Sequence, residues 1–554
     1  MACGGLGRYE PATVERIADA LDAGVRQVHR DRRSTLWLDR EPLRWRGGLT
    51  RGLAWSERYP APDPGATRSW QEASCGLDAC GLMLGPRRRM VHSSVSGTMP
   101  VYWIEHAGAT YFASRVDALA RGVRARLDPD WQAWAGIFSL RAPLGERTPF
   151  RQIRRLPQFT VLERRSGSAV AEVEPWPWAE IAPTETLAGA ADSVMAALAD
   201  ALTPLRATGA TVLLSGGLDS RILLGAAHDA GVALTALTAV ADDGRGWEAG
   251  LAGDAARAAG AEFQSFRAGD PAEYRRLWID HLEGSDFQFL LGSFVLPLFP
   301  RLQELGRPAL DGLAFDVFAV RGGRFYTPEM LDPAPGYDSG VPLWHSLRER
   351  TMKGAAERAL AGPYAAAVIR SSRRQFRREA ARFRGNPNQA LLAQYSTRML
   401  RGVATLPKQT VGRYAAVLTP GATDRVARAL LSLRASEKRD RRLYGAIFDR
   451  IASPSARMPT VANTTQPDAV AQSLRMRFQP PMVDLYERSL RDGSLTPILG
   501  QKLAASLREG TLGEAIHGTA LHRAAMAVTA FHLWVERYES SLSPIDPDQM
   551  LERE

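Results

Sequence analysis

Residues 211–225 read TVLLSGGLDSRILLG, and this stretch decides the fold of the chain. Its apolar, β-branched start predicts a buried parallel strand, and its Ile- and Leu-rich end predicts a helix. A Ser-Gly-Gly turn beginning at Ser215 separates the two. Glycines let backbone N–H groups turn inward, and the helix dipole adds partial positive charge. The stretch therefore predicts an anion site.

The side chains around this turn suit phosphate groups. Hydroxyl groups can donate to phosphate oxygens, and a carboxylate can hold a Mg²⁺ that neutralises them. No G-K-[ST] follows, so the turn differs from the Walker loop. The alternative is an ordinary glycine-rich turn of a Rossmann-like fold. Five fixed positions disfavour that alternative: Ser215, Gly216, Gly217, Asp219 and Ser220.

The composition is that of a globular chain without a membrane segment. The 554 residues are 45% hydrophobic and 23% charged, and this length predicts at least two domains. The sequence has no apolar run of about eighteen residues and no signal-peptide pattern. Its three cysteines fit neither a disulfide framework nor a zinc pattern. These features favour a cytoplasmic location.

The net charge of +10 comes almost entirely from arginine. Such a balance suits a nucleic acid, a phosphate-rich ligand or an acidic peptide. The basic segments 370–384 and 434–450 have helical periodicity and no interleaved aromatic residues. We therefore interpret them as solvated helix faces, and nucleic acid as a disfavoured partner.

Residues 1–175 are predicted to be rich in β-structure. Strand candidates alternate with glycine and proline turns, and short helices are expected at 14–23 and 116–121. The clearest strand candidates are 34–38, 81–84, 100–104 and 110–113. A Pro- and Trp-rich stretch follows, and its residues 176–186 are interpreted as a linker between domains.

From residue 187 onward the pattern changes to alternating helices and strands. A helix at 186–203 precedes the strand of the opening stretch, and further strands are expected at 232–238 and 262–266 with a helix at 247–259 between them. Strands separated by helices predict a parallel sheet, in which ligands bind at the carboxyl ends of the strands. Residues 340–554 are expected to be mostly helical.

A second informative site follows the strand candidate 308–310. There Asp311-Gly312 and Asp316 form a D-G-x-x-x-D pattern, and a glycine pair follows at Gly322 and Gly323. Taken alone, Asp316 is typical of a surface or helix-capping aspartate. Paired with the carboxylate of the first loop, it supplies the second ligand that a Mg²⁺–pyrophosphate group needs.

The two motifs and the helical region after them resemble the asparagine synthetase family, whose loop S-G-G-x-D-S is that of the ATP pyrophosphatases. Fainter similarities are SGTMPVYW from Ser96, YFAS from Tyr111 and TPFRQIRRLP from Thr148. The resemblance implies an α/β chain with an N-terminal glutaminase-like, Ntn-type β-sandwich flanked by helices at 1–175, which is α+β. It implies an adenine-nucleotide α-hydrolase-like parallel sheet with a helical C-terminal region at 187–554.

The resemblance also implies which residues bind ATP and Mg²⁺. Asp219 and Asp316 would share the Mg²⁺ and act in catalysis, and Asp311-Gly312 would line the AMP side. The role of Glu248 is not fixed. The full set of implied ATP-binding residues is Leu213, Leu214, Ser215, Gly216, Gly217, Asp219, Ser220, Leu237, Thr238, Asp311 and Gly312.

Departures from the family pattern narrow the function. A working glutaminase uses an N-terminal cysteine whose own amine is the base. Here Ala2 precedes Cys3, so we interpret the N-terminal domain as a scaffold without glutaminase chemistry. Leu313 replaces the Tyr or Glu that β-lactam synthetases and asparagine synthetases place there, and residues 460–468 lack the expected lysine. The run SGGLDSR and the arginine-rich helices resemble lasso peptide cyclases better.

This resemblance implies an ATP- and Mg²⁺-dependent macrolactam cyclase. It would adenylate an Asp or Glu side chain of a precursor peptide and join it to the peptide's N-terminal amine, releasing AMP and pyrophosphate. It further implies a leader-peptidase or leader-recognition protein as partner. The alternatives left open are an amide-forming enzyme for a small molecule, a glutamine-dependent amidotransferase, an RNA-modifying adenylating enzyme and a non-catalytic scaffold.

Overall fold

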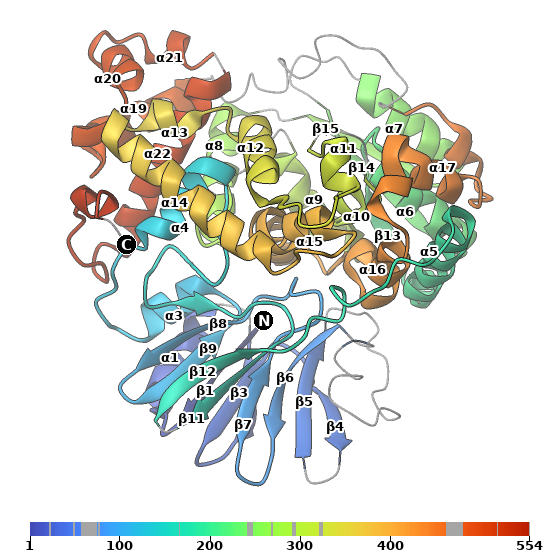
Figure 1. Cartoon of the computed structure of the whole chain (residues 1–554), viewed down its shortest axis with the longest axis horizontal. Helices are drawn as coiled ribbons and strands as arrows, with labels where there is room; N and C mark the ends of the chain where they lie inside the picture. Colours follow the sequence, from blue (N-terminus) through green and yellow to red (C-terminus); the bar gives the residue numbers. More distant parts are fainter. Residues whose placement is uncertain are drawn as a thin grey trace. The chain divides into compact units, whose positions relative to one another are not determined.

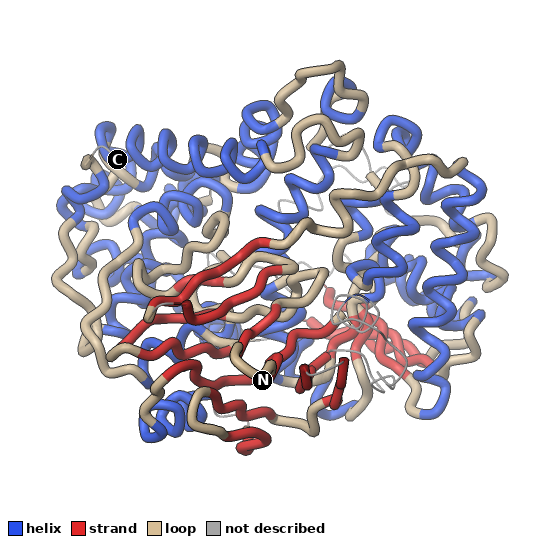
Figure 2. The backbone as a smooth tube through the Cα atoms, turned by 60° about the horizontal axis from the view of Figure 1, so that its bottom comes forward, coloured by secondary structure: helices blue, strands red, loops and turns tan. Residues whose placement is uncertain are grey.

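The chain has a mixed α/β fold (Figure 2) in two compact units. The computed structural model describes residues 1–21, 24–47, 50–56, 75, 78–165, 167–240, 247–267, 270–290, 295–320, 325–460, 480–517 and 519–552. Unit 1 comprises Met1–Ala135, Pro143–Glu180 and Trp534–Glu554, and unit 2 comprises Gly136–Ala142 and Ile181–Leu533. The C-terminal segment thus belongs to unit 1, which no sequence pattern indicates.

Unit 1 contains two antiparallel sheets (Figure 1). Their strands are β1 (Ala2–Gly7), β2 (Arg26–Arg30), β3 (Ser34–Leu38), β4 (Leu43–Gly47), β5 (Thr50–Ser56), β6 (Ala79–Leu84), β7 (Arg89–His92), β8 (Tyr102–His106), β9 (Ala109–Ala113), β10 (Arg154–Arg155), β11 (Thr160–Arg165) and β12 (Ser168–Val173). Among the described residues, the strand orders are β10-β8-β9-β1-β3-β2 and β12-β11-β7-β6-β5-β4.

One apolar core serves both sheets of unit 1. Side chains alternate between the two faces of a strand, so each sheet can present one apolar face. Leu36 and Phe112 come from the first sheet, and Leu82 and Val91 come from the second. All four are fully buried in the same cluster. Two sheets that share a core in this way form a sandwich. The helices described in this part of the chain are α1 (Pro11–Leu21), α3 (Val116–Gly122) and α4 (Trp131–Leu140).

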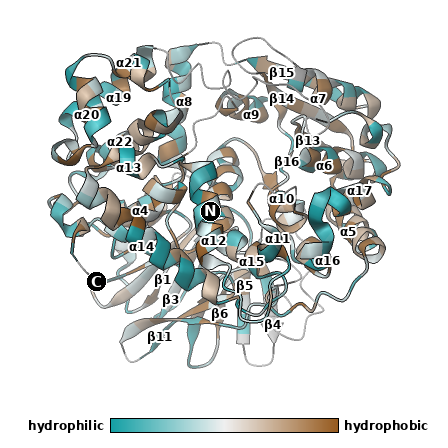
Figure 3. Cartoon of the chain, turned by 45° about the horizontal axis from the view of Figure 1, so that its top comes forward, coloured by the Kyte–Doolittle hydropathy of each residue, from teal (hydrophilic) through white to brown (hydrophobic). Residues whose placement is uncertain are grey.

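Unit 2 contains the parallel sheet that the opening stretch predicts. Its strands are β13 (Ala210–Leu213), β14 (Leu234–Val240), β15 (Glu262–Arg267), β16 (Ala309–Leu310) and β17 (Val417–Leu418). In the described residues their order is β15-β14-β13-β16-β17, and every pairing is parallel. Apolar residues, brown in Figure 3, dominate β13 and β14, and every residue of β14 is buried. Such continuous apolar runs are typical of the inner strands of a parallel sheet.

Helices connect these strands as expected. The helix α5 (Leu187–Leu202) precedes β13, and the hydroxyl of Thr186 caps it by accepting a hydrogen bond from the Gly189 N–H at 3.1 Å. The helices α6 (Leu218–Asp229) and α7 (Trp247–Ala258) follow β13 and β14, and α8 (Pro271–Gly284) follows β15.

The rest of unit 2 is largely helical, with one exception. The strand β17 lies in the region expected to be helical, and two π-helical segments, Tyr395–Val403 and Leu406–Thr410, precede it. The remaining α-helices among the described residues are α9 (Phe299–Leu305), α10 (Phe315–Phe318), α11 (Pro328–Leu331), α12 (Gly340–Thr351), α13 (Ala355–Ala359), α14 (Gly362–Ala381), α15 (Gln389–Gln394), α16 (Asp424–Leu431), α17 (Arg442–Phe448), α19 (Pro480–Asp492), α20 (Gln501–Arg508), α21 (Leu512–Ala515) and α22 (Thr519–Tyr538).

The Pro- and Trp-rich stretch interpreted as a linker begins as part of unit 1. Trp176 and Trp178 are buried, and the Trp176 indole N–H donates to the Val95 carbonyl oxygen at 2.8 Å. Only from Ile181 onward does the chain belong to unit 2. In the part of the chain that the structure describes, no helix is long and apolar enough to span a membrane.

Candidate functional site

The two sequence motifs leave the parallel sheet between adjacent strands. From β13 the chain adds β14 and β15 on one side and then β16 and β17 on the other, so the order reverses between β13 and β16. Ligands of such sheets bind where the order reverses, at the carboxyl ends of the strands. Val212 pairs with Leu310 in register. Consequently the loop at Ser215 and the turn at Asp311 begin next to each other.

Two hydroxyl groups fix the shape of the loop after β13. The Ser215 N–H donates to Ser220 Oγ at 3.1 Å, and Ser220 Oγ donates to the Ser215 carbonyl oxygen at 3.2 Å. The Gly217 N–H in turn donates to Ser215 Oγ at 3.2 Å. Ser215 is exposed, whereas Gly216 and Gly217 are buried. The loop is therefore held in place by the serines that the sequence singled out, with Ser215 on the accessible side.

The beginning of α6 is suited to an anion. Gly217 is its N-cap, and no side chain caps the first turn of this helix. The first N–H groups of a helix have no partner within the helix, and the helix dipole makes this end positive. Asp219 stands in the same turn and is half-buried. The local backbone therefore fits phosphate oxygens, with a carboxylate beside them.

The second motif lies directly against this helix start. A Cβ atom built on Gly312 would lie 2.8 Å from Asp219 Cβ and 3.5 Å from the Ser220 backbone nitrogen. Only glycine allows this close approach. The Tyr444 hydroxyl of α17 donates a short hydrogen bond to Asp219 Oδ1. The structure therefore brings the S-G-G-L-D-S loop and the D-G turn together, and Tyr444 orients the carboxylate between them.

A cluster of charged groups lies at the end of β16, next to Gly312. Burial raises the pKa of Asp311. The Leu313 N–H, which donates to Asp311 Oδ1 at 2.9 Å, lowers this pKa. The positive charge of Lys408 also lowers it, whereas the negative charge of Asp316 raises it. Lys408 Nζ donates to the Val417 carbonyl oxygen at 3.2 Å. Asp311, Asp316 and Lys408 thus share one electrostatic environment at the end of β16.

The turn that carries Asp316 has an unusual backbone. Ala314, the N-cap of α10, has a φ of 77°, which lies in the left-handed region that residues other than glycine rarely adopt. Such strained positions cluster at functional sites. The side chain of Leu313 is buried and aliphatic, so this position supplies no acid or base.

The donor set fits Mg²⁺ only together with other ligands. In the described residues, no group of three or more His, Cys, Asp and Glu side chains could hold a metal ion. Mg²⁺ is commonly bound by one or two carboxylates, with phosphate oxygens and water completing its shell. Asp219 lies in the first turn of α6, which follows β13, and Asp316 lies in α10, which follows β16.

The residues expected around the adenosine are mostly buried. Leu214, Leu237 and Thr238 have almost no exposed surface, and Leu213 is half-buried. The Thr238 hydroxyl donates to the Leu214 carbonyl oxygen at 2.8 Å, and the Leu214 N–H donates to the Leu237 carbonyl oxygen at 2.9 Å. These two hydrogen bonds join the ends of β13 and β14. Glu248 lies in the first turn of α7 and is half-buried.

Three residues near the site were missed by sequence reasoning. Tyr444 lies in a basic segment interpreted as a solvated face, although the spacing of Leu443, Tyr444 and Ile447 places all three on the buried side of α17. Tyr326 and Arg398 interact electrostatically with Asp316. Neither belongs to a recognisable motif, and both are far from Asp219 in the sequence.

The glycine pair and the stretch 460–468, both noted in the sequence, lie largely outside the described residues. Gly322 and Gly323, and residues 461–468 of the stretch that lacks the expected lysine, lie outside the described residues. The segment just before that stretch is held by Arg221, the residue that follows the S-G-G-L-D-S loop. Its buried guanidinium donates to the carbonyl oxygens of Met458 and Pro459 at 3.1 and 3.2 Å.

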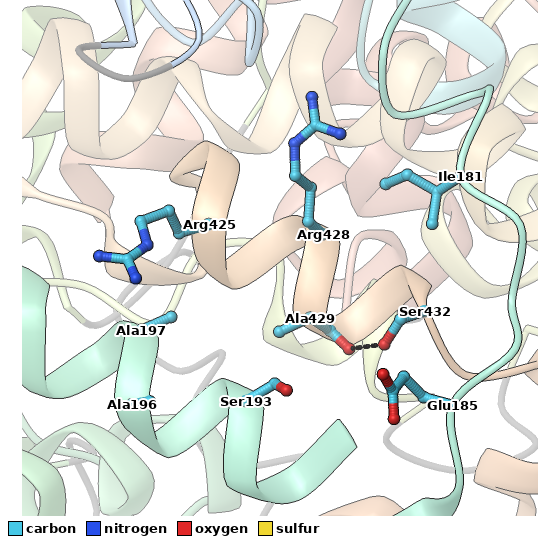
Figure 4. Close-up of a pocket in the computed structure, with 9 residues that line it drawn as sticks. All are labelled: Ile181, Glu185, Ser193, Ala196, Ala197, Arg425, Arg428, Ala429 and Ser432. Atoms are coloured by element: carbon cyan, nitrogen blue, oxygen red, sulfur yellow. Dashed lines mark hydrogen bonds between the residues drawn. The ribbon is translucent and has the colours of Figure 1, made fainter. Parts of the chain in front are cut away.

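A surface cavity of about 500 Å³ in unit 2 lies apart from the predicted residues (Figure 4). It is lined by α5, α16 and the chain around Glu185. Its two arginines are paired within the protein, Arg425 with Asp200 and Arg428 with Asp424. No predicted site residue lines this cavity, and both of its arginines are paired. We therefore place the candidate site at the strand ends.

Cys3 has no access to a substrate. It lies inside β1, where it pairs with Trp37 of β3 and Ala113 of β9, and its side chain is fully buried. Burial raises the pKa of the Cys3 thiol to about 12. Nucleophilic attack requires the thiolate, so this cysteine is inert at neutral pH.

The chain matches no protein-family model. A search of curated proteins also finds no match.

Proposed function

We propose that the chain is an ATP-dependent, AMP-forming amide ligase that closes a macrolactam ring in a peptide, as lasso peptide cyclases do. The contact between Gly312 and Asp219 carries this proposal, because it joins the S-G-G-L-D-S loop to the D-G-x-x-x-D turn where the strand order reverses. That arrangement supports cleavage of ATP between the α- and β-phosphates. The peptide substrate rests on the resemblance of SGGLDSR and of the arginine-rich helices.

Each residue has a defined task in the proposed reaction. An Asp or Glu carboxylate oxygen of the peptide attacks the α-phosphorus of ATP, and the bond to the β-phosphate breaks. The α6 N-terminus and the Ser215 and Ser220 hydroxyls hold the phosphates, so that charge on the departing pyrophosphate is stabilised. Asp219 and Asp316 would hold Mg²⁺, which supplies charge neutralisation when bound.

Ring closure follows on the activated carbonyl. The peptide's N-terminal amine attacks the acyl carbon of the acyl-adenylate, AMP departs, and the amine loses a proton to a base. Holding amine and carbonyl in the reacting geometry is worth about 7–11 kcal/mol in well-oriented systems. The buried Leu313 side chain is aliphatic and is not this base.

The proposal extends to the two units and to partners. Unit 1 would be an Ntn-type scaffold without glutaminase activity, and unit 2 an adenine-nucleotide α-hydrolase-like domain. A precursor peptide would be the substrate, and a leader peptidase or leader-recognition protein would act with the enzyme in the cytoplasm. The inert environment of Cys3 supports an amine supplied by the substrate over ammonia from glutamine.

The proposal is tested by products. Purified protein is incubated with Mg·ATP and linear candidate peptides that carry an internal Asp or Glu. We expect AMP, pyrophosphate and a peptide that has lost one water. Formation of ADP, or release of ammonia from glutamine coupled to AMP formation, would overturn it.

A further inference from the structure

Near Asp316 lies a guanidinium that forms no ion pair among the described residues. Arg398 belongs to the π-helical segment Tyr395–Val403 and is half-buried. Within the described part of the chain its Nε atom is buried without a hydrogen-bond partner, and its guanidinium enters no ion pair. π-Helical segments are rare and frequently mark functional sites. Arg398 is therefore a cation with an unused buried donor in a type of segment that often marks function.

Aromatic contacts hold Arg398 toward Asp316. Tyr395 of the same segment stacks on Phe318 of α10, with ring centroids 4.8 Å apart, and α10 carries Asp316. The guanidinium carbon of Arg398 lies 5.8 Å from the centroid of the Phe325 ring. A ring over the face of a guanidinium leaves its N–H edge for hydrogen bonds. That edge is the part that can receive a planar anion.

Tyr326 adds a second unsatisfied donor at the same place. It is 6% exposed, and among the described residues its hydroxyl has no hydrogen-bond partner. Burial raises the pKa of Tyr326 well above its usual value, the charge of Asp316 raises it further, and Arg398 lowers it. The unpartnered phenolic hydroxyl can donate a hydrogen bond to a ligand.

The unsatisfied state of Arg398 differs from that of Lys438. Lys438 is also buried without a hydrogen-bond partner in the described residues, but burial lowers its pKa to about 7, so it can lose its charge. Arginine keeps its proton in proteins. A buried cation that cannot be neutralised is costly unless an anion pairs with it. Arg398 therefore indicates a ligand, whereas Lys438 does not.

We propose that Arg398 and Tyr326 form the subsite that receives the carboxylate of the acid substrate. This inference rests on the proposed function and deepens it. The α6 N-terminus already provides for phosphates at the end of β13, whereas Arg398 lies on the β16 side with Asp311 and Asp316. Two neighbouring carboxylates favour a singly charged ligand over the multiply charged pyrophosphate. A guanidinium edge and a hydroxyl match the two oxygens of a carboxylate.

The test compares three probes on the full-length protein by calorimetric titration. These are N-acetyl-glutamate α-amide, the isosteric N-acetyl-glutamine α-amide and inorganic pyrophosphate. We expect the carboxylate probe to bind about tenfold or more tightly than the amide. Arg398→Lys should abolish that preference, because lysine lacks the planar fork, and Tyr326→Phe should reduce it several-fold. Arg413→Lys, an exposed arginine of the same region, is the matched control and should leave it unchanged.

The outcomes separate this inference from the proposed function. Equal affinity of the two amino-acid probes would overturn the subsite, and so would loss of pyrophosphate binding in Arg398→Lys with the carboxylate preference retained. Tyr326→Phe keeps the shape of the side chain, so a folding defect in the arginine variant leaves the inference testable. If the preference is found but no AMP forms with any peptide, the subsite stands and the proposed function fails.

Discussion

Two buried polar clusters, one in each unit, differ in how their groups are satisfied. In unit 1, Asp78 accepts hydrogen bonds from the Ser96 N–H at 3.0 Å and from the Ser96 hydroxyl at 2.7 Å, and Ser96 Oγ lies 2.9 Å from Thr98 Oγ1. In unit 2, Tyr326 and Arg398 face Asp316 with unused donors. A closed network stabilises a fold, whereas unused buried donors indicate a ligand.

Removing a carboxylate from the unit 2 site should have the largest effect. We expect Asp219→Ala and Asp316→Ala each to lower AMP formation at least about a hundredfold, because each removes charge from the site that would hold Mg²⁺. The rate of AMP release from α-labelled ATP measures this. Asp200→Ala, which changes an exposed carboxylate of α5, is the control. Activity close to that of the parent protein in either site variant would contradict the account.

Breaking the unit 1 cluster should affect stability alone. Asp78→Ala leaves the Ser96 N–H and hydroxyl without their buried acceptor, and we expect a loss of about 3 kcal/mol in the free energy of unfolding. Denaturant unfolding measures it, and Asp78→Asn, which keeps an acceptor, should lose less. AMP formation per folded molecule should not change. A large drop in activity with unchanged stability would show that this cluster is not purely structural.

Lys438, a third buried polar group, should make the stability of the protein depend on pH. The folded protein holds a neutral amine above pH 7, because burial lowers the Lys438 pKa to about 7, whereas the unfolded chain keeps the proton up to about pH 10.4. Stability attributable to Lys438 should therefore rise with pH between these values, by up to about 1.4 kcal/mol per pH unit. Unfolding of Lys438→Met and of the parent protein, compared from pH 6 to pH 9, measures this difference. Parallel pH curves would contradict it.

Tyr444 tests how far the orientation of Asp219 matters. Tyr444→Phe removes only the hydroxyl that donates to Asp219 Oδ1. We expect AMP formation to fall about tenfold, as one lost hydrogen bond of this kind implies. The matched control is Tyr486→Phe, which removes another buried tyrosine hydroxyl, the one 3.1 Å from His522 Nε2. If both variants lose activity equally, the Tyr444 effect is one of stability.

Cys3 should give the smallest effect. Cys3→Ala removes a buried thiol that is inert at neutral pH, so we expect unchanged AMP formation and at most a modest loss of stability. The native protein should also resist alkylation at Cys3. Activity that is lost in Cys3→Ala and restored by added ammonium would reinstate a glutaminase.

The sequence predicts the parallel sheet well, because strong local patterns specify it. The strand–loop–helix at 211–225 appears as β13 and α6, and the helix expected at 247–259 appears as α7 (Trp247–Ala258). The adjacency of Asp219 and Gly312 follows from the rule that parallel strands end at one edge. The strand β17 could not be predicted, since two residues carry no periodicity.

The unsatisfied donors of the site could not be predicted for a different reason. Arg398 lies in a π-helical segment, and the sequence around it has the pattern of an ordinary α-helix. Its relation to Asp316 depends on the Tyr395–Phe318 stack, which joins residues far apart in the chain. The burial of Tyr326 could not be predicted either, because a single tyrosine in a sequence carries no pattern that indicates burial. Contacts between residues so far apart in the chain leave no mark in the local sequence pattern.

We propose that the motifs after β13 and β16 form one AMP-forming site. The most direct measurement follows α-labelled ATP with the parent protein and with Asp316→Ala, in the presence of Mg²⁺ and candidate peptides. We expect labelled AMP with the parent protein, formed together with a peptide that has lost one water, and neither product with Asp316→Ala. Labelled ADP as the product, or AMP formed equally by both proteins, would contradict it.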